Sequence, residues 1–163
     1  MFTLGIIISS DKGSKGERAD QSGLVIKEIM ESHQYEVKKY VILPDEQDLL
    51  AQEMVHMCDE LKLDLVLTSG GTGFSQRDIT PEATLQVVER LTPGISEAIR
   101  YNSLQITPRA MLSRAVSGIR KSTLIINLPG SPKAVRESLE YIVPSLQHGL
   151  EILKGTASEC ARK

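Results

Sequence analysis

The sequence contains no tryptophan, and only two of its 163 residues are cysteines, Cys58 and Cys160. Two cysteines cannot build a disulfide framework or a CxxC zinc site, so we expect reduced thiols. No apolar run approaches the roughly 20 residues that a membrane-spanning helix needs. The sequence therefore predicts neither a disulfide-stapled scaffold nor a membrane partner.

The chain also lacks an excess of charge of either sign. It has 19 Lys and Arg residues against 21 Asp and Glu residues, a net charge of −2. A balanced chain has no excess positive field to hold a polyanion, so we predict no nucleic-acid partner. The apolar start Met1–Ser9 lacks the basic leader and small-residue cleavage site of a secretion signal. We therefore expect a cytoplasmic protein.

Length and composition indicate a single domain over residues 1–163, because 40% apolar and 25% charged residues are ordinary for globular proteins. The run Ala157–Lys163 is expected to form a frayed polar tail. The apolar runs that are typical of strands are Thr3–Ser9, Tyr35–Leu43, Leu63–Ser69 and Thr123–Leu128. The second run alternates with lysines, which favours a position nearer a sheet edge.

Helical periodicity lies between and after these strands. Helices are predicted at Ser22–Ser32, Gln47–Leu61, Pro81–Leu91, Ile95–Leu104, Pro108–Val116, Pro132–Tyr141 and Ser145–Lys154. This alternation of strands and helices indicates an α/β fold layered on a largely parallel sheet.

Three of the helix starts share a hydroxyl residue followed by proline: Thr80-Pro81, Thr107-Pro108 and Ser131-Pro132. The hydroxyl is expected to cap free N–H groups, and proline suits the first helical position. Two of these starts follow a strand through a loop that contains glycine. Ligands of open α/β sheets bind beyond the carboxyl ends of the strands, so we expect the site at that edge.

The loop after the third strand begins with Gly70-Gly71-Thr72-Gly73. Its glycines permit positive φ and a close approach of the backbone to a ligand, and its amides could form an anion-binding nest. The alternative is a plain glycine turn. The loop is neither a Walker loop nor a dinucleotide fingerprint, because the Gly-Lys-Ser/Thr ending and the third glycine are both absent.

Two aspartates follow strand ends. Asp78 closes the glycine loop, where a carboxylate beside bound phosphates favours Mg²⁺ as the compensating charge. Alternatively, it pairs with Arg77 or assists the following helix start. Asp45 follows the second strand, and capping of the next helix is the simpler interpretation. A metal or catalytic role for Asp45 requires that it meets Asp78 in space.

Two further loops are candidates for binding. Residues 9–23 are rich in hydroxyls, glycine and cations and could hold a phosphate, or could be a flexible solvated loop. Residues 127–133 leave their strand through Pro129-Gly130, and the exposed backbone groups could bind the edge of a flat heterocycle, or the segment could be only a capped turn.

Several motifs occur in the order and at the spacing of a known protein family. They are Thr68–Gly73, Arg77–Thr84, Pro44-Asp45-Glu46, Met111-Leu112-Ser113-Arg114 and Ile126–Pro132. Together they resemble the signature of the MogA/MoaB-type molybdenum cofactor biosynthesis proteins, to which the G domain of gephyrin is similar. The resemblance extends from Gly5 to about Gly155.

The resemblance implies a three-layer α/β/α sandwich that often forms a homotrimer. It implies a molybdopterin adenylyltransferase, which joins AMP from Mg²⁺·ATP to the terminal phosphate of molybdopterin and releases pyrophosphate. A separate molybdate-inserting protein then uses the product. The alternatives are a non-catalytic molybdopterin-binding or scaffold protein of the same fold, a domain of a larger molybdotransferase or CinA-like protein, and a protein-interaction adaptor.

The resemblance also assigns roles to residues. It implies that Asp45 and Asp78 are the catalytic residues, and the chemistry of carboxylates beside phosphates suggests that they hold Mg²⁺. The positions that match pterin or nucleotide contacts are Ser10, Asp11, Ser22, Gly70, Gly71, Thr72, Gly73, Ser103, Ser113, Asn127, Leu128, Pro129 and Gly130.

Overall fold

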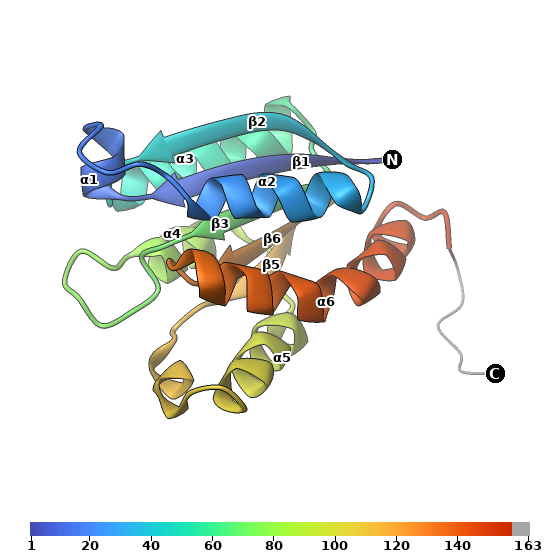
Figure 1. The fold of residues 1–163 in the computed structure, drawn as a ribbon. Helices are drawn as coiled ribbons and strands as arrows, with labels where there is room; N and C mark the ends of the chain where they lie inside the picture. Colours follow the sequence, from blue (N-terminus) through green and yellow to red (C-terminus); the bar gives the residue numbers. More distant parts are fainter. Residues whose placement is uncertain (158–163) are drawn as a thin grey trace.

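A computed structural model describes residues 1–157 of the chain. Its centre is a six-stranded sheet with the strand order β2-β1-β3-β6-β5-β4 (Figure 1). The strands are β1 (Phe2–Ser9), β2 (Tyr35–Leu43), β3 (Leu65–Ser69), β4 (Arg90–Leu91), β5 (Ser117–Arg120) and β6 (Thr123–Leu128).

The four strands predicted from the apolar runs form the parallel part of this sheet. β1 pairs with β2 and β3, and β3 pairs with β6, all in parallel. β5 and β4 extend the sheet beyond β6 in antiparallel pairs. The largely parallel sheet and the edge position of β2 confirm the prediction, and the parallel strand ends converge on one edge.

Helices cover both faces of the sheet (Figure 1). They are α1 (Asp11–Ser14), α2 (Ser22–Ser32), α3 (Gln47–Val55), α4 (Thr80–Val87), α5 (Pro93–Leu104), α6 (Pro132–Leu153), the π-helix η1 (His56–Glu60) and the 3₁₀ helix η2 (Pro108–Leu112).

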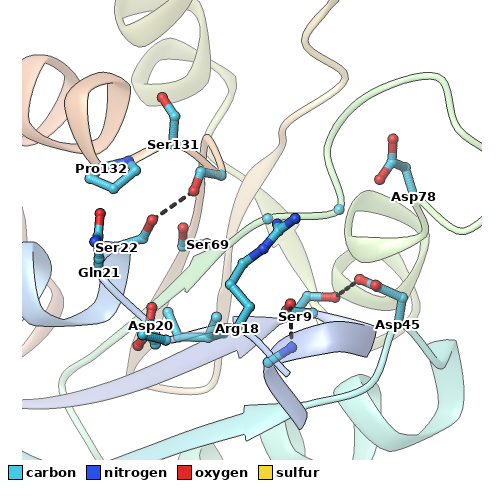
Figure 2. A pocket seen from close by; sticks show the side chains of 17 residues that line it. Ser9, Arg18, Asp20, Gln21, Ser22, Asp45, Ser69, Asp78, Ser131 and Pro132 are labelled. Carbon is cyan, nitrogen blue, oxygen red and sulfur yellow. Dashed lines mark hydrogen bonds between the residues drawn. The ribbon is translucent and has the colours of Figure 1, made fainter. Parts of the chain in front are cut away.

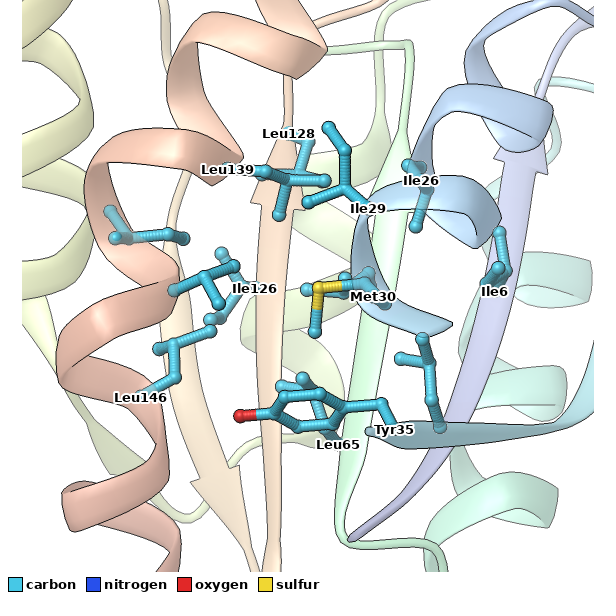
Figure 3. Close-up of a cluster of buried hydrophobic side chains, with 14 of the residues drawn as sticks. Ile6, Ile26, Ile29, Met30, Tyr35, Leu65, Ile126, Leu128, Leu139 and Leu146 are labelled. Atoms are coloured by element: carbon cyan, nitrogen blue, oxygen red, sulfur yellow. The ribbon is translucent and has the colours of Figure 1, made fainter. Parts of the chain in front are cut away.

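Two buried clusters separate the helices by sheet face. One cluster joins Ile6 of β1 to residues of α2, α5 and α6, among them Met30, Ile99 and Leu139 (Figure 3). The other joins Ile7 of β1 to α3, η1 and α4. Neighbouring residues of β1 thus enter opposite cores, because side chains alternate along a strand. The arrangement is the three-layer α/β/α sandwich that the family resemblance implies.

The predicted helix Pro81–Leu91 is shorter in the structure. α4 ends at Val87, and Val88 is extended with φ −75° and ψ 146°. The chain then pairs with β5, since Glu89 N donates to the carbonyl of Ile119 at 2.8 Å. The spacing of apolar residues suggested a longer helix, but Leu91 is an exposed residue of edge strand β4.

The predicted helix Pro108–Val116 is also wrong in its second half. Only Pro108–Leu112 is helical, as the 3₁₀ helix η2, and β5 starts at Ser117. β5 carries Gly118, a residue of low strand propensity, so local signals do not predict it. A Cβ at Gly118 would lie 2.8 Å from the carbonyl oxygen of Arg90, which explains why glycine pairs with β4 here.

The two helices predicted around Pro144 are one helix, α6, of 22 residues. Proline inside a helix removes one hydrogen bond and clashes with the preceding turn. Here Val143 and Leu146, on either side of it, are both buried against the sheet. Their burial holds both halves of the amphipathic helix on one face despite the local cost.

Two of the three predicted hydroxyl caps are confirmed. The Oγ1 of Thr107 accepts from Arg109 N at 3.3 Å, and the Oγ of Ser131 accepts from Ala134 N at 3.2 Å. The prediction for Thr80 is wrong, because Thr80 is the first residue of α4 and Ile79 precedes the helix. Within residues 1–157, the buried Thr80 hydroxyl has no hydrogen-bond partner.

Cys58 is a free, buried cysteine, as expected of a reduced thiol. Burial raises the pKa of its thiol to about 11, so the group is neutral and unreactive near neutral pH. Cys160 and most of the predicted tail, residues 158–163, lie outside the described residues. Across residues 1–157, no helix combines the length and apolar character needed to cross a bilayer.

Candidate functional site

A cavity of about 680 Å³ opens at the edge of the sheet where β1, β3 and β6 end (Figure 2). This size is within the range of about 300–1,000 Å³ that is typical of ligand sites. Four loops enclose it, and each follows a parallel strand. The lining residues are Ile8, Ser9, Ser10, Gly13, Arg18, Ala19, Asp20, Gln21, Ser22, Asp45, Ser69, Gly70, Gly71, Asp78, Gly130, Ser131 and Pro132.

Asp45 reaches the cavity from the loop between β2 and α3. Its Oδ1 accepts a hydrogen bond from the Ser9 hydroxyl at 2.5 Å, and its Oδ2 accepts one from Asp11 N at 3.0 Å. Asp45 makes no side-chain cap of α3, whose N-cap is Glu46. The capping interpretation of Asp45 is therefore wrong.

Asp78 reaches the same cavity from the loop between β3 and α4. Its Oδ2 accepts a hydrogen bond from Ser75 N at 3.0 Å, which fixes the carboxylate within its own loop. Arg77 turns away from it and pairs with Asp11 and Glu46. Asp45 and Asp78 thus line one cavity although they are 33 residues apart in the sequence. Figure 2 shows both on the same side of it.

Asp11 ties the Asp45 loop to the glycine loop. The carboxylate of Asp11 accepts from Arg77 Nε at 2.9 Å and from Arg77 Nη2 at 2.8 Å, and its Oδ1 also accepts from Asp45 N at 3.0 Å. The Arg77 guanidinium, followed by the Asp45 amide, lowers the pKa of Asp11 to about 2. Asp11 is therefore ionised across the physiological range, and it does not line the cavity.

The first two glycines of the loop adopt the predicted positive φ, 94° at Gly70 and 69° at Gly71. A Cβ at Gly70 would lie 2.5 Å from the carbonyl oxygen of Ser9, and a Cβ at Gly71 would lie 2.3 Å from Oγ1 of Thr80. Glycine is thus required at both positions, by conformation and by space. The result is bare backbone along one wall of the cavity.

The loop after β6 is bonded to its neighbours through its carbonyl groups. The carbonyl of Pro129 accepts from the Ser69 hydroxyl at 2.7 Å, and the carbonyl of Gly130 accepts from the Ser22 hydroxyl at 2.6 Å. These bonds join the ends of β3 and β6 to the start of α2. Figure 2 shows Ser22 and Ser69 on the side of the cavity opposite Asp45 and Asp78.

Of the residues that the resemblance assigned, seven line the cavity: Ser10, Ser22, Gly70, Gly71, Gly130, Asp45 and Asp78. The others are outside its lining. They are Asp11, Thr72, Gly73, Ser103, Ser113, Asn127, Leu128 and Pro129.

Asn127 and Leu128 are fully buried in the sheet. The Asn127 side chain donates to the hydroxyls of Thr68 and Thr84 at 3.0 and 2.8 Å, and its oxygen accepts from Val116 N at 3.2 Å. Asn127 therefore links β6, β3, α4 and the segment before β5. These contacts make Asn127 a buried structural group outside the cavity lining.

Several lining residues did not stand out in the sequence. Arg18 is the one Lys or Arg side chain that lines the cavity within residues 1–157, and Figure 2 shows it extending between the two sides. It belongs to a loop with three basic residues, and the composition of the loop does not indicate which of them reaches the cavity. Ser9 and Ser69 are the last residues of β1 and β3, and their place at strand ends was the signal that could have found them.

The charges of the cavity suit a divalent cation together with an anionic ligand. Asp20, Asp45 and Asp78 provide three carboxylates against the single guanidinium of Arg18. Bound phosphates would be repelled by this excess unless a cation lay between them and the carboxylates. Among the described residues, no group of three or more His, Cys, Asp or Glu side chains could hold a metal alone. Mg²⁺, which takes one or two carboxylates plus substrate phosphates, fits this donor set.

Fold and site together define an α/β protein with a cavity, lined by serine and aspartate side chains and glycine backbone, at the carboxyl edge of its sheet. The chain belongs to the family described as the probable molybdopterin binding domain, whose profile matches residues 5–148. This membership confirms the family that the motifs indicated.

Three relatives illustrate the family. The molybdopterin adenylyltransferase of Helicobacter pylori strain J99 is 42% identical over 162 residues, which cover 98% of this chain and 92% of the relative. The gephyrin of Dictyostelium discoideum is 41% identical over 93% of this chain but only 22% of its own length. The crystal structure of the molybdopterin biosynthesis enzyme MoaB from Thermus thermophilus matches with a TM-score of 0.90 and 47% identity, and the match covers 95% of this chain and 98% of that one.

Proposed function

We propose that this protein is a molybdopterin adenylyltransferase of molybdenum cofactor biosynthesis, which uses Mg²⁺·ATP to adenylylate molybdopterin with release of pyrophosphate. The observation that carries the proposal is the placement of Asp45 and Asp78 on one cavity, beside bare glycine backbone and one arginine. The H. pylori relative, similar over almost the whole of both chains, supports it by its name.

The reaction needs positioning and charge neutralisation more than a covalent nucleophile. A terminal phosphate oxygen of molybdopterin attacks the α-phosphorus of ATP, and the bond between that phosphorus and the bridging oxygen of the β-phosphate breaks. The electron pair of this bond leaves with pyrophosphate. Mg²⁺, when bound, would neutralise the phosphate oxygens, and Asp45 and Asp78 are the residues that would hold it.

The other lining residues have complementary roles in the proposal. The backbone N–H of Gly71 would donate to a phosphate oxygen, a bond worth about 1.5–3 kcal/mol for a charged acceptor. The N–H of Gly70 already donates to the carbonyl of Leu128 at 3.4 Å, so Gly70 would contribute the close approach of bare backbone. Arg18 would pair with the departing phosphates, because a guanidinium binds phosphate through two parallel bonds. Ser10, Ser22 and Gly130 would contact the ligands along the remaining walls.

Six of the eight assigned residues outside the cavity lining would act by shaping it. Thr72 and Gly73 would set the course of the glycine loop, and Asn127, Leu128 and Pro129 would support the floor. Ser103 and Ser113 remain candidates for pterin contacts that follow from the resemblance alone. Asp11 would act through Asp45.

The setting of the enzyme belongs to the same proposal. We expect a cytoplasmic homotrimer formed of single domains over residues 1–163, with a molybdate-inserting protein taking the product. Exposed apolar side chains on α5 and η2, including Tyr101, Leu104 and Met111, support self-association. A scaffold role, suggested by the gephyrin relative, is the second candidate, and the paired aspartates in the cavity favour the enzyme.

The proposal is tested with purified protein, Mg²⁺·ATP and molybdopterin, with mass spectrometry of the AMP-linked product. The kcat values of the Asp78→Asn and Asp45→Asn variants should each be at least about 100-fold lower than that of the wild type, because each substitution removes a negative charge that would hold the cation. Asp48→Asn is the matched control, since Asp48 is an exposed carboxylate three residues from Asp45 and outside the cavity. Absence of the adenylylated product with wild-type protein would refute the proposal and favour the scaffold.

A further inference from the structure

The loop that carries Asp78 has an exposed middle. Residues 74–77 are all exposed, and they lie between the glycines that line the cavity and Asp78. The Asp78 carboxylate itself accepts a hydrogen bond from Ser75 N at 3.0 Å, within the same loop. An exposed loop therefore needs an anchor outside itself to keep Asp78 in place.

Arg114 provides such an anchor at the base of the loop. Its Nε donates to the carbonyl of Gly73 at 2.7 Å, and its Nη2 donates to the carbonyl of Asp78, also at 2.7 Å. Its own backbone N–H donates to the carbonyl of Thr72 at 2.9 Å. One planar guanidinium therefore closes the segment 73–78, and its Nη1 pairs with Glu82 in the first turn of α4.

Arg77 provides a second anchor near the tip of the loop. Its guanidinium binds the Asp11 carboxylate through two donors and binds Glu46 Oε1 at 3.0 Å. Asp11 in turn exchanges two hydrogen bonds with Asp45, because each residue donates its N–H to the carboxylate of the other at 3.0 Å. Arg77 thus connects the Asp78 loop to the loop of Asp45.

We infer that Arg114 and Arg77 are positioning residues that hold Asp78 and Asp45 in their metal-binding arrangement before the cation arrives. Neither arginine lines the cavity, so neither contacts the ligand there. The inference deepens the proposed function and rests on it for the identity of the reaction. The loop geometry that it describes can be measured without any reaction.

The first experiment compares Arg114→Lys and Arg77→Lys with wild type by hydrogen exchange of the amides of residues 73–78. Lysine keeps the charge, but a single ammonium cannot span two carbonyl groups as the guanidinium does. Exchange in this segment should become roughly tenfold faster in each variant, since charge-assisted bonds that close the loop are lost. Arg120→Lys is the matched control, because Arg120 binds Asp59 of η1 and the carbonyl of Val87, the last residue of α4, and makes no hydrogen bond to residues 73–78.

The second experiment measures kinetics in the same variants. Displacement of Asp78 should lower kcat about 10- to 100-fold while KM for molybdopterin changes less than about threefold. Unchanged exchange in both variants, or faster exchange with an unchanged kcat, would overturn the inference. If the wild-type protein forms no adenylylated product, the proposed function fails. The anchoring role is then decided by comparing hydrogen exchange and Mg²⁺·ATP affinity between the variants and the wild type, and equal values in all of them would overturn it.

Discussion

Asn127 is the residue for which the family resemblance and the structure predict different experimental results. A ligand contact would affect binding and leave stability unchanged. In the structure its side chain is 0% exposed and joins three partners, Thr68, Thr84 and Val116, through bonds of 2.8 to 3.2 Å. The Asn127→Ala substitution removes all three bonds at once.

The expected cost follows from these three bonds. Each contributes about 0.5–1.5 kcal/mol net, and a buried group left without a partner costs about 1–3 kcal/mol. We therefore expect Asn127→Ala to lower the free energy of unfolding by about 2–5 kcal/mol. For a domain of this size, each kcal/mol corresponds to about 2–4 °C of Tm, so Tm should fall by about 4–20 °C.

Thermal unfolding followed by circular dichroism tests this expectation, with ligand affinity measured at a temperature where both proteins are folded. Asn102→Ala is the control, because Asn102 makes one bond of 3.3 Å to the carbonyl of Glu137 and lies partly exposed on α5. Its Tm should change by less than about 3 °C. A normal Tm for Asn127→Ala together with lost affinity would refute the structural role.

Two further predictions concern stability. Gly70→Ala should lower the free energy of unfolding by about 2–5 kcal/mol in urea titrations, because φ is 94° and the new Cβ would meet a backbone oxygen at 2.5 Å. Gly94→Ala, with open space around it in α5, should be neutral or stabilising by about 1 kcal/mol, and equal losses in both variants would contradict this reasoning. Burial alone would raise the pKa of Asp64, but Lys154 and the two donors of Thr3 outweigh it and lower this pKa below its usual value. The stability from this carboxylate is thus present above about pH 4 and is lost as pH falls through the lower folded pKa. The urea midpoint of Asp64→Asn should therefore fall less steeply than that of the wild type as the pH drops below about 4, and an equal fall in both proteins would contradict this expectation.

Local sequence signals were sufficient for the parallel centre of the fold. The β-type runs at β1, β3 and β6 are apolar because helices cover both faces of the sheet there, and the lysines of β2 mark its place at the edge. The same signals failed at β4 and β5. β5 pairs with β6 on one side and with β4 on the other, and the close approach of Gly118 to Arg90 that allows the second pairing is not encoded in a local pattern.

The sequence by itself determined the α/β class, the edge of the sheet where the cavity lies, and the two aspartates that follow strand ends. Only the tertiary structure decided that Asn127 is a buried structural group, that Arg18 reaches the cavity, and that Asp11 contacts Arg77 and Asp45 instead of the cavity. The reason is physical: strand direction fixes where loops gather, whereas the direction of each side chain depends on neighbours that are distant in the chain.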